Sequence, residues 1–170
     1  MKKWIVCILS IVMIFALAAC GGKPSGSANT DQTEKKTEAT TEKATTVQRD
    51  LPEGDYEELG SGSFYLSGAS GSTENGDEII IYPDMNALPY AHLDIELWDM
   101  DGSILTYVYI DGVKVKEKQV GAGLQSSMGL QEEWQVTEGD HIVEAVQYAD
   151  NDTSGEMVFY RSAKYTVKSK

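Results

Sequence analysis

The sequence predicts an all-β domain at residues 51–170, folded as an antiparallel sandwich of about seven to nine short strands. Apolar and polar residues alternate with a period of two in several segments, which is typical of half-buried strands. Residues that favour turns separate these segments at short intervals. No segment of the domain combines the length and the apolar stripe of a helix.

The first half of the domain contains four expected strands. Two short ones lie at 63–66 and 78–82. The segment 93–98 is the clearest strand, because three apolar residues alternate with polar or aromatic ones. A turn at 99–102 then leads into 103–110, whose β-branched and aromatic residues on both faces indicate a central strand.

A hairpin is expected next in the chain. Asp111-Gly112 lies between two strand-like segments and is a strong short-range hairpin signal. The return strand at 113–120 carries lysines, which suit a sheet edge because charge discourages unwanted pairing. The remaining strands are expected at 128–136, 141–148, 156–161 and 163–167.

The first twenty residues predict export from the cytoplasm. Lys2 and Lys3 form a positive start, and the run 4–19 is uncharged and almost wholly apolar. This run is shorter than the roughly 20 residues of a membrane-spanning helix and fits a secretion signal. An ordinary signal peptide and an uncleaved anchor helix both stay open as alternatives for this run.

The apolar run ends in Leu17-Ala18-Ala19-Cys20, which resembles the lipobox of bacterial lipoproteins. The resemblance implies that residues 1–19 are a signal peptide that is removed, and that Cys20 becomes the lipid-bearing N-terminus. It also implies anchoring in the cell membrane, with the domain on the extracytoplasmic face. With the signal removed, Cys20 is the one cysteine of the chain, so the mature protein forms no internal disulfide.

Residues 20–50 predict a disordered linker behind the lipidated cysteine. The linker is rich in Thr, Ser, Lys and Glu, and its low hydrophobicity cannot offset the entropy of ordering. Its five basic and five acidic residues balance, whereas 51–170 holds seven basic against twenty-two acidic residues. Nucleic acid is not an expected partner of so acidic a domain, because its binding relies on Lys and Arg contacts.

Two turn regions resemble those of bacterial immunoglobulin-like and fibronectin-III-like surface modules. The run 138–145 is similar to their "G-x-H-x-V-x-A" strand entry, and 109–113 is similar to their "Y-x-D-G" hairpin. The resemblance implies an immunoglobulin-like sandwich that serves as a spacer or a binding domain on a cell surface. The Cys…Trp…Cys pattern of antibody domains is absent from the sequence.

Catalytic chemistry is not expected. His92 falls on the polar face of its strand, His141 is expected to hydrogen-bond the turn before it, and no G-x-S-x-G motif accompanies them. Asp99 and Asp101 offer oxygen ligands to a hard cation, but the calcium-loop pattern is incomplete and Asp is also a common turn residue. We therefore expect no enzyme activity, no cofactor and at most a weak metal site at these two aspartates.

Aromatic side chains are the candidate ligand-binding residues, namely Trp98, Tyr107, Tyr109 and Tyr148. If they are exposed together, they form a platform for sugars or peptides; the alternative is that they fill the core or cover a sheet face. The sequence thus predicts a non-catalytic interaction module on a membrane tether, with a cell-wall polymer or an envelope protein as its partner. A small envelope enzyme or enzyme accessory subunit and a structural spacer are the rival hypotheses.

Overall fold

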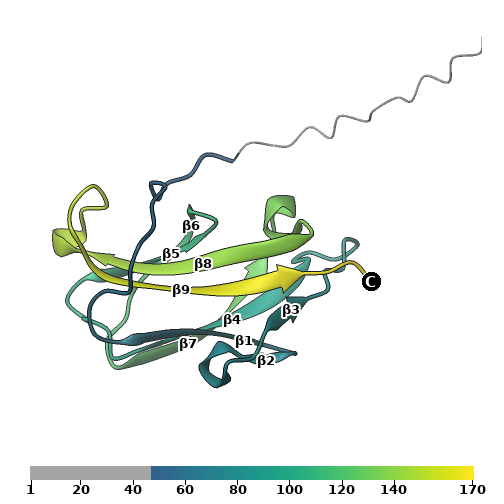
Figure 1. Ribbon diagram of the computed structural model, residues 1–170, viewed down its shortest axis with the longest axis horizontal. Coiled ribbons are helices and arrows are strands. Elements are labelled where there is room, and N and C mark those ends of the chain that lie inside the picture. Colours follow the sequence, from purple (N-terminus) through teal and green to yellow (C-terminus); the bar gives the residue numbers. More distant parts are fainter. Residues whose placement is uncertain (1–46) are drawn as a thin grey trace, which may run out of the picture. The chain divides into compact units, whose positions relative to one another are not determined.

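The computed structural model describes residues 47–170, which fold into two β-sheets (Figure 1). The predictions for the signal peptide, for Cys20 and for most of the linker lie outside these residues. Within 47–170, regular structure is strand apart from three short 3-10 helices, so the all-β prediction is confirmed. No helix in the described part of the chain is long and apolar enough to cross a membrane.

The four-stranded sheet has the order β2-β1-β4-β7, and all its pairings are antiparallel. Its strands are β1 (Ser63–Gly68), β2 (Gly71–Ser72), β4 (Ala91–Trp98) and β7 (Gly123–Leu130). The alternation predicted for β4 is present, because Leu93, Ile95 and Leu97 are buried while His92 and Asp94 are exposed. A helix η1 (Thr73–Asn75) connects β2 to the next strand.

The five-stranded sheet has the order β3-β9-β8-β5-β6. Its strands are β3 (Ile79–Ile81), β5 (Leu105–Ile110), β6 (Val113–Gln119), β8 (Gly139–Tyr148) and β9 (Met157–Val167). The fold is not wholly antiparallel, because β3 pairs with β9 in the parallel direction. This pairing arises where the chain changes sheets, since β2 lies in the first sheet and β3 in the second.

The hairpin prediction is confirmed in its details. β5 pairs with β6 across Asp111 and Gly112, both of which have positive φ (49° and 77°) as this tight turn requires. β5 lies between β6 and β8, and the lysine-bearing β6 forms the edge of its sheet. Nine strands are present in all among the described residues, at the upper end of the expected number.

Two expected strands have different limits in the structure. The strand expected at 128–136 starts earlier, as β7, and ends at Leu130; it is followed by the helix η2 (Glu133–Val136). The strands expected at 156–161 and 163–167 are one continuous strand, β9, preceded by the helix η3 (Ala149–Asn151). The end of β7 has a local cause, because the Gln135 side chain bonds the backbone after Leu130 and turns the chain away.

Apolar side chains from both sheets meet in one core between them. Both sheets contribute fully buried residues, for example Leu93 and Ile95 from β4 and Val143 and Ala145 from β8. A second cluster lies on the opposite face of the five-stranded sheet and contains Leu51, Tyr107, Tyr109, Val146, Tyr148 and Tyr160. This sheet is therefore apolar on both faces, which explains why β5 shows no alternation.

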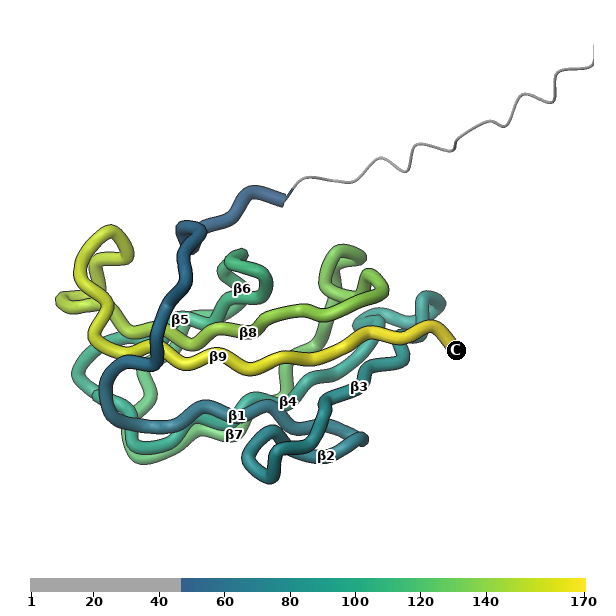
Figure 2. The backbone as a smooth tube through the Cα atoms, in the orientation of Figure 1, coloured from purple at the N-terminus to yellow at the C-terminus, as the bar shows by residue number. Residues whose placement is uncertain are grey.

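Residues 47–60, here called the N-terminal segment, cover that second cluster. The backbone N–H groups of Asp50 and Leu51 both donate to the carbonyl of Gly112, at 2.9 Å each, and Leu51 is fully buried. Farther along, Leu59 pairs with Tyr160 of β9. The segment thus runs from the β5–β6 turn to β9 before it enters β1 (Figure 2). Packing begins before residue 51, the expected start of the domain.

Candidate functional site

The three tyrosines of the candidate aromatic set are buried, in agreement with the alternative that they cover a sheet face. Tyr107, Tyr109 and Tyr148 are 5 %, 2 % and 2 % exposed, and they lie in the cluster under the N-terminal segment. The rings of Tyr107 and Tyr148 pack edge to face at 5.6 Å between centroids. Leu51 completes their cover, a contact between segments more than 50 residues apart that strand periodicity does not reveal.

Trp98 is the one member of the predicted aromatic set that reaches solvent. It ends β4 in the other sheet and is 36 % exposed. Its ring lies against Gly123 of β7, and a Cβ atom at that glycine would overlap the ring. The ring of Trp98 therefore packs on the neighbouring strand β7, in the sheet that does not contain the three tyrosines. The four aromatic residues do not form one surface.

Asp99 and Asp101 act in the turn between β4 and β5. Asp101 Oδ1 accepts hydrogen bonds from the backbone N–H and the hydroxyl of Ser103, at 2.8 and 2.6 Å. These bonds lower the pKa of Asp101. Asp99 adopts a left-handed backbone conformation with φ 55°. No group of three or more potential metal ligands occurs among residues 47–170.

His141 resembles the centre of a catalytic triad in outline only. Its Nδ1 lies 2.7 Å from Asp111 Oδ2, and its Nε2 lies 2.8 Å from the carbonyl oxygen of Thr137 and 3.4 Å from the Thr137 hydroxyl. Both close partners are acceptors, so this arrangement favours a ring that carries a proton on both nitrogens. Burial opposes the charged ring, but the bonds to Asp111 and the Thr137 carbonyl outweigh it and raise the pKa of His141. A doubly protonated ring has no free lone pair and does not act as a general base.

His141 instead fixes the connection between β7 and β8, as the sequence predicted for the turn. The ring is 4 % exposed and stacks on Tyr165 at 4.9 Å between centroids. The Tyr165 hydroxyl in turn donates to the backbone carbonyl of Gln135 at 2.6 Å. Together the two side chains hold η2 and the turn after it against the five-stranded sheet.

Glu144 is a buried carboxylate with one unpaired oxygen. It is 6 % exposed, its Oε1 accepts a 3.1 Å hydrogen bond from the Tyr160 hydroxyl, and its Oε2 has no partner among the described residues. Burial raises the pKa of Glu144, and burial together with this carboxylate raises the pKa of Tyr160 to about 12. An ionised group held this way destabilises the fold.

Glu144→Gln is expected to raise the free energy of unfolding at pH 7 by about 1 to 2 kcal/mol, because the amide removes a buried negative charge. The raised pKa means that the folded state binds the proton more tightly than the unfolded state does. The wild-type penalty is therefore absent below the unfolded pKa and grows as pH rises through the folded pKa. Urea unfolding at pH 4 and pH 7 measures both effects; an equal gain at the two pH values contradicts the assignment.

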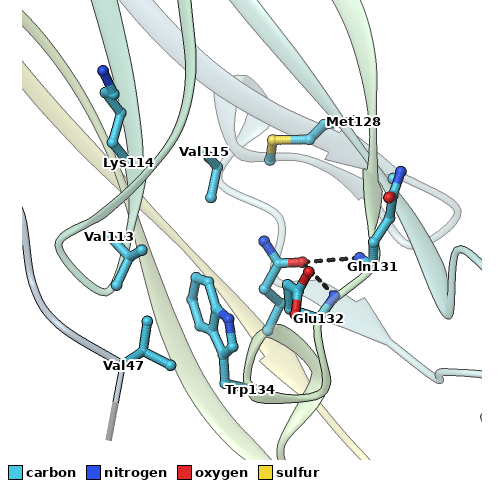
Figure 3. Close-up of a pocket in the computed structure, with 10 residues that line it drawn as sticks. Val47, Val113, Lys114, Val115, Met128, Gln131, Glu132 and Trp134 are labelled. Carbon is cyan, nitrogen blue, oxygen red and sulfur yellow. Dashed lines mark hydrogen bonds between the residues drawn. The ribbon is translucent and has the colours of Figure 1, made fainter.

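A concave surface lies between the edges of the two sheets. This groove has a volume of about 630 Å³, within the range typical of ligand pockets. Its apolar lining consists of Val47, Val113, Val115, Met128 and Trp134. Figure 3 shows the two β6 valines across the groove from Met128 and Gln131, with Val47 and Trp134 at one end. The groove therefore joins residues from the N-terminal segment, β6, β7 and η2.

A β-bulge in β6 shapes the side of the groove. The register with β5 shifts between Val108 and Tyr109, so Val115 has no partner of its own. The bulge turns Lys116 toward the other sheet, where its Nζ donates to Ser126 Oγ of β7 at 2.7 Å. The groove is thus bounded by a direct contact between the two edge strands.

Gln135 supplies a fixed hydrogen-bond donor in the groove lining. Its Oε1 accepts the backbone N–H groups of Gln131 and Glu132 at 2.9 and 3.0 Å, which settles the orientation of the amide. The side-chain Nε2 therefore points away from the turn and bonds no other described residue. Gln135 as a whole is only 5 % exposed, and it belongs to the lining of the groove. A ligand carbonyl is its natural partner.

Sequence reasoning missed the groove. Met128, Trp134 and Gln135 were expected in one strand, which would have placed them in line along a sheet. The one available signal was the polar stretch Gln131-Glu132-Glu133 ahead of Trp134, which interrupts the strand pattern. No protein family, curated protein or solved structure shows a significant match to this chain.

Proposed function

We propose that this protein is a lipid-tethered, extracytoplasmic binding module without catalytic activity, and that its ligand occupies the groove between β6 and β7. The observation that carries the proposal is the groove itself, which combines an apolar lining with the unpaired amide donor of Gln135. Pockets that bind ligands have this composition, an apolar surface with a few oriented polar groups. The ligand belongs to the cell wall or to another envelope protein.

An immunoglobulin-like arrangement of the strands is part of the proposal. The strands can be given immunoglobulin letters, with A, B and E for β1, β4 and β7, and C, F and G for β5, β8 and β9. The first sheet then has the order A-B-E and the second has the order G-F-C. Immunoglobulin domains have A, B and E in one sheet and C, F and G in the other. In this scheme β6 extends the second sheet, and the groove lies beside β6, E and the E–F connection.

The tether rests on the run that ends at Cys20. A lipidated N-terminal cysteine carries more than one acyl chain, and two chains give stable anchoring where one chain binds reversibly. The linker after Cys20 would hold the domain away from the lipid surface, where the groove is accessible to other envelope components.

Site-specific photo-crosslinking tests the groove as the binding site. A photoreactive amino acid replaces Val115, which lines the groove, or Val158, which is 37 % exposed on β9 and is not among the groove residues. In living cells, the Val115 position is expected to yield a discrete adduct with a protein or a cell-wall fragment, and the Val158 position is not. Equal labelling from both positions would show that the groove has no special role.

A further inference from the structure

β7 has an unprotected outer edge, in contrast to the other three sheet edges of the described fold. β2 is two residues long and β3 is three, so neither offers much backbone to a partner. β6 is interrupted by its bulge and carries three lysines and one glutamate. These are the ordinary means by which proteins prevent edge-to-edge pairing.

The β7 edge lacks all of these protections. Its eight residues, Gly123–Leu130, include no charged residue and no proline. Its register with β4 runs without a bulge from Gly123 to Leu130, so the strand is regular over its whole length. The edge that faces away from β4 has no strand partner among residues 47–170. Such an edge is a template for an additional strand.

An added strand would face two different surfaces. On its inner face lies the groove, because Met128 of β7 belongs to the groove lining. The exposed Ser127 of β7 would lie next to the outer face of the added strand. Asp94 of β4, the cross-strand partner of Ser127, lies one strand farther on the same face. Ser127 is small, so a long side chain of the added strand can pass over it toward Asp94.

Charge distinguishes between the possible occupants. Glu96 of β4 also lies on this outer face, and hydrogen bonds from Gln125 and Ser67 lower its pKa and keep it ionised. The outer face therefore favours basic side chains. A second copy of this chain is disfavoured, because each domain carries seven basic against twenty-two acidic residues and the copies repel.

We infer that the partner is an extended peptide segment that pairs with the free edge of β7, with apolar residues toward the groove and basic residues toward Asp94 and Glu96. The inference rests on the proposed function and adds the chemistry of the ligand. Backbone hydrogen bonds supply affinity in this mode of recognition, and pockets for alternate side chains supply specificity. The amide of Gln135 provides a further bond to a peptide carbonyl.

Synthetic peptides test strand addition on the full chain. The probe is a capped nonapeptide that alternates valine with lysine. A second peptide has glutamate in place of each lysine. Two further peptides keep the lysines and carry N-methyl groups on alternate backbone amides, one on the odd-numbered set and the other on the even-numbered set. Binding is measured by fluorescence anisotropy, and amide hydrogen exchange locates it. We expect the lysine peptide to protect β7 amides, the glutamate peptide to bind at least about tenfold more weakly, and one N-methylated set to lose at least about tenfold in affinity.

Variants at Ser127 test the position of the basic side chains. Because Ser127 is exposed, Ser127→Lys and Ser127→Glu both keep the fold intact. The lysine variant is expected to bind the probe about fivefold to tenfold more weakly, and the glutamate variant at least as tightly as wild type.

Three results would overturn the inference. Unchanged affinity of both N-methylated peptides would exclude backbone pairing, and preference for the glutamate peptide would exclude the assigned charge. Protection of β7 amides by self-association without peptide would identify a second copy as the occupant. If any of these occurs while the Val115 position still yields its discrete adduct, the binding groove stands and only the ligand chemistry is wrong.

Discussion

Cys20→Ala is expected to remove the protein from the membrane fraction or to leave it as an uncut precursor. Alanine has no thiol to which lipid can be attached, and without the acyl chains an acidic domain has no affinity for anionic lipid headgroups. The expected effect is therefore nearly all or none. Fractionation of cells into membrane and soluble material measures it, and mass spectrometry of the N-terminal peptide shows whether lipid is present.

Cys7→Ala is the matched control for this experiment. Cys7 lies inside the apolar run that the lipobox prediction assigns to the discarded signal, and alanine preserves the apolar character of that run. The Cys7 variant is expected to be cut, lipidated and retained like the wild type. Normal processing and membrane retention of the Cys20 variant would contradict the lipoprotein hypothesis, whatever the Cys7 variant does.

Strands and turns were predictable from the sequence because their causes are local. The alternation in β4 follows from one buried face, and the hairpin at Asp111 follows from the positive φ that a two-residue turn needs. The lysines of β6 marked an edge for a reason that does not depend on the rest of the fold. By contrast, the parallel pairing of β3 with β9 was not predictable, because it depends on where the chain changes sheets and not on a local pattern.

The groove and the buried tyrosines have causes that lie far apart in the sequence. Tyr107 and Tyr109 are covered because Leu51 folds back over β5, and strand periodicity carries no information about such a cover. The groove needs Val47 and Val113 beside Trp134, three residues from three separate segments. Its position also depends on Gln135, which ends β7 through side-chain bonds to the backbone rather than through a turn residue.

His141→Phe is expected to lower the free energy of unfolding by about 3 kcal/mol at pH 6. Phenylalanine preserves the stacking on Tyr165 but removes both hydrogen bonds, and it leaves the Thr137 carbonyl and one Asp111 oxygen without their partner. Because His141 and Tyr165 hold the turn that carries Trp134, the variant is also expected to bind the groove ligand more weakly. Urea unfolding followed by circular dichroism measures the stability change.

The pH dependence separates the charged ring from simple packing. The pKa of His141 is raised in the folded state, so its contribution is complete below the unfolded value of about 6.5 and is lost as pH rises through the folded pKa. A neutral ring donates one hydrogen bond, and so the Asp111 or the Thr137 contact must be lost. The stability gap between wild type and His141→Phe should therefore narrow from pH 6 to pH 9.

Asp111→Asn tests the partner of the charged ring, because asparagine tolerates a positive φ but carries no charge. When both proteins also carry Asp111→Asn, the stability gap caused by His141→Phe should narrow at a lower pH than it does with Asp111 present. A gap that is constant from pH 6 to pH 9 would show that the pKa of His141 is the same in the folded and the unfolded state, which would contradict the stabilised charged ring.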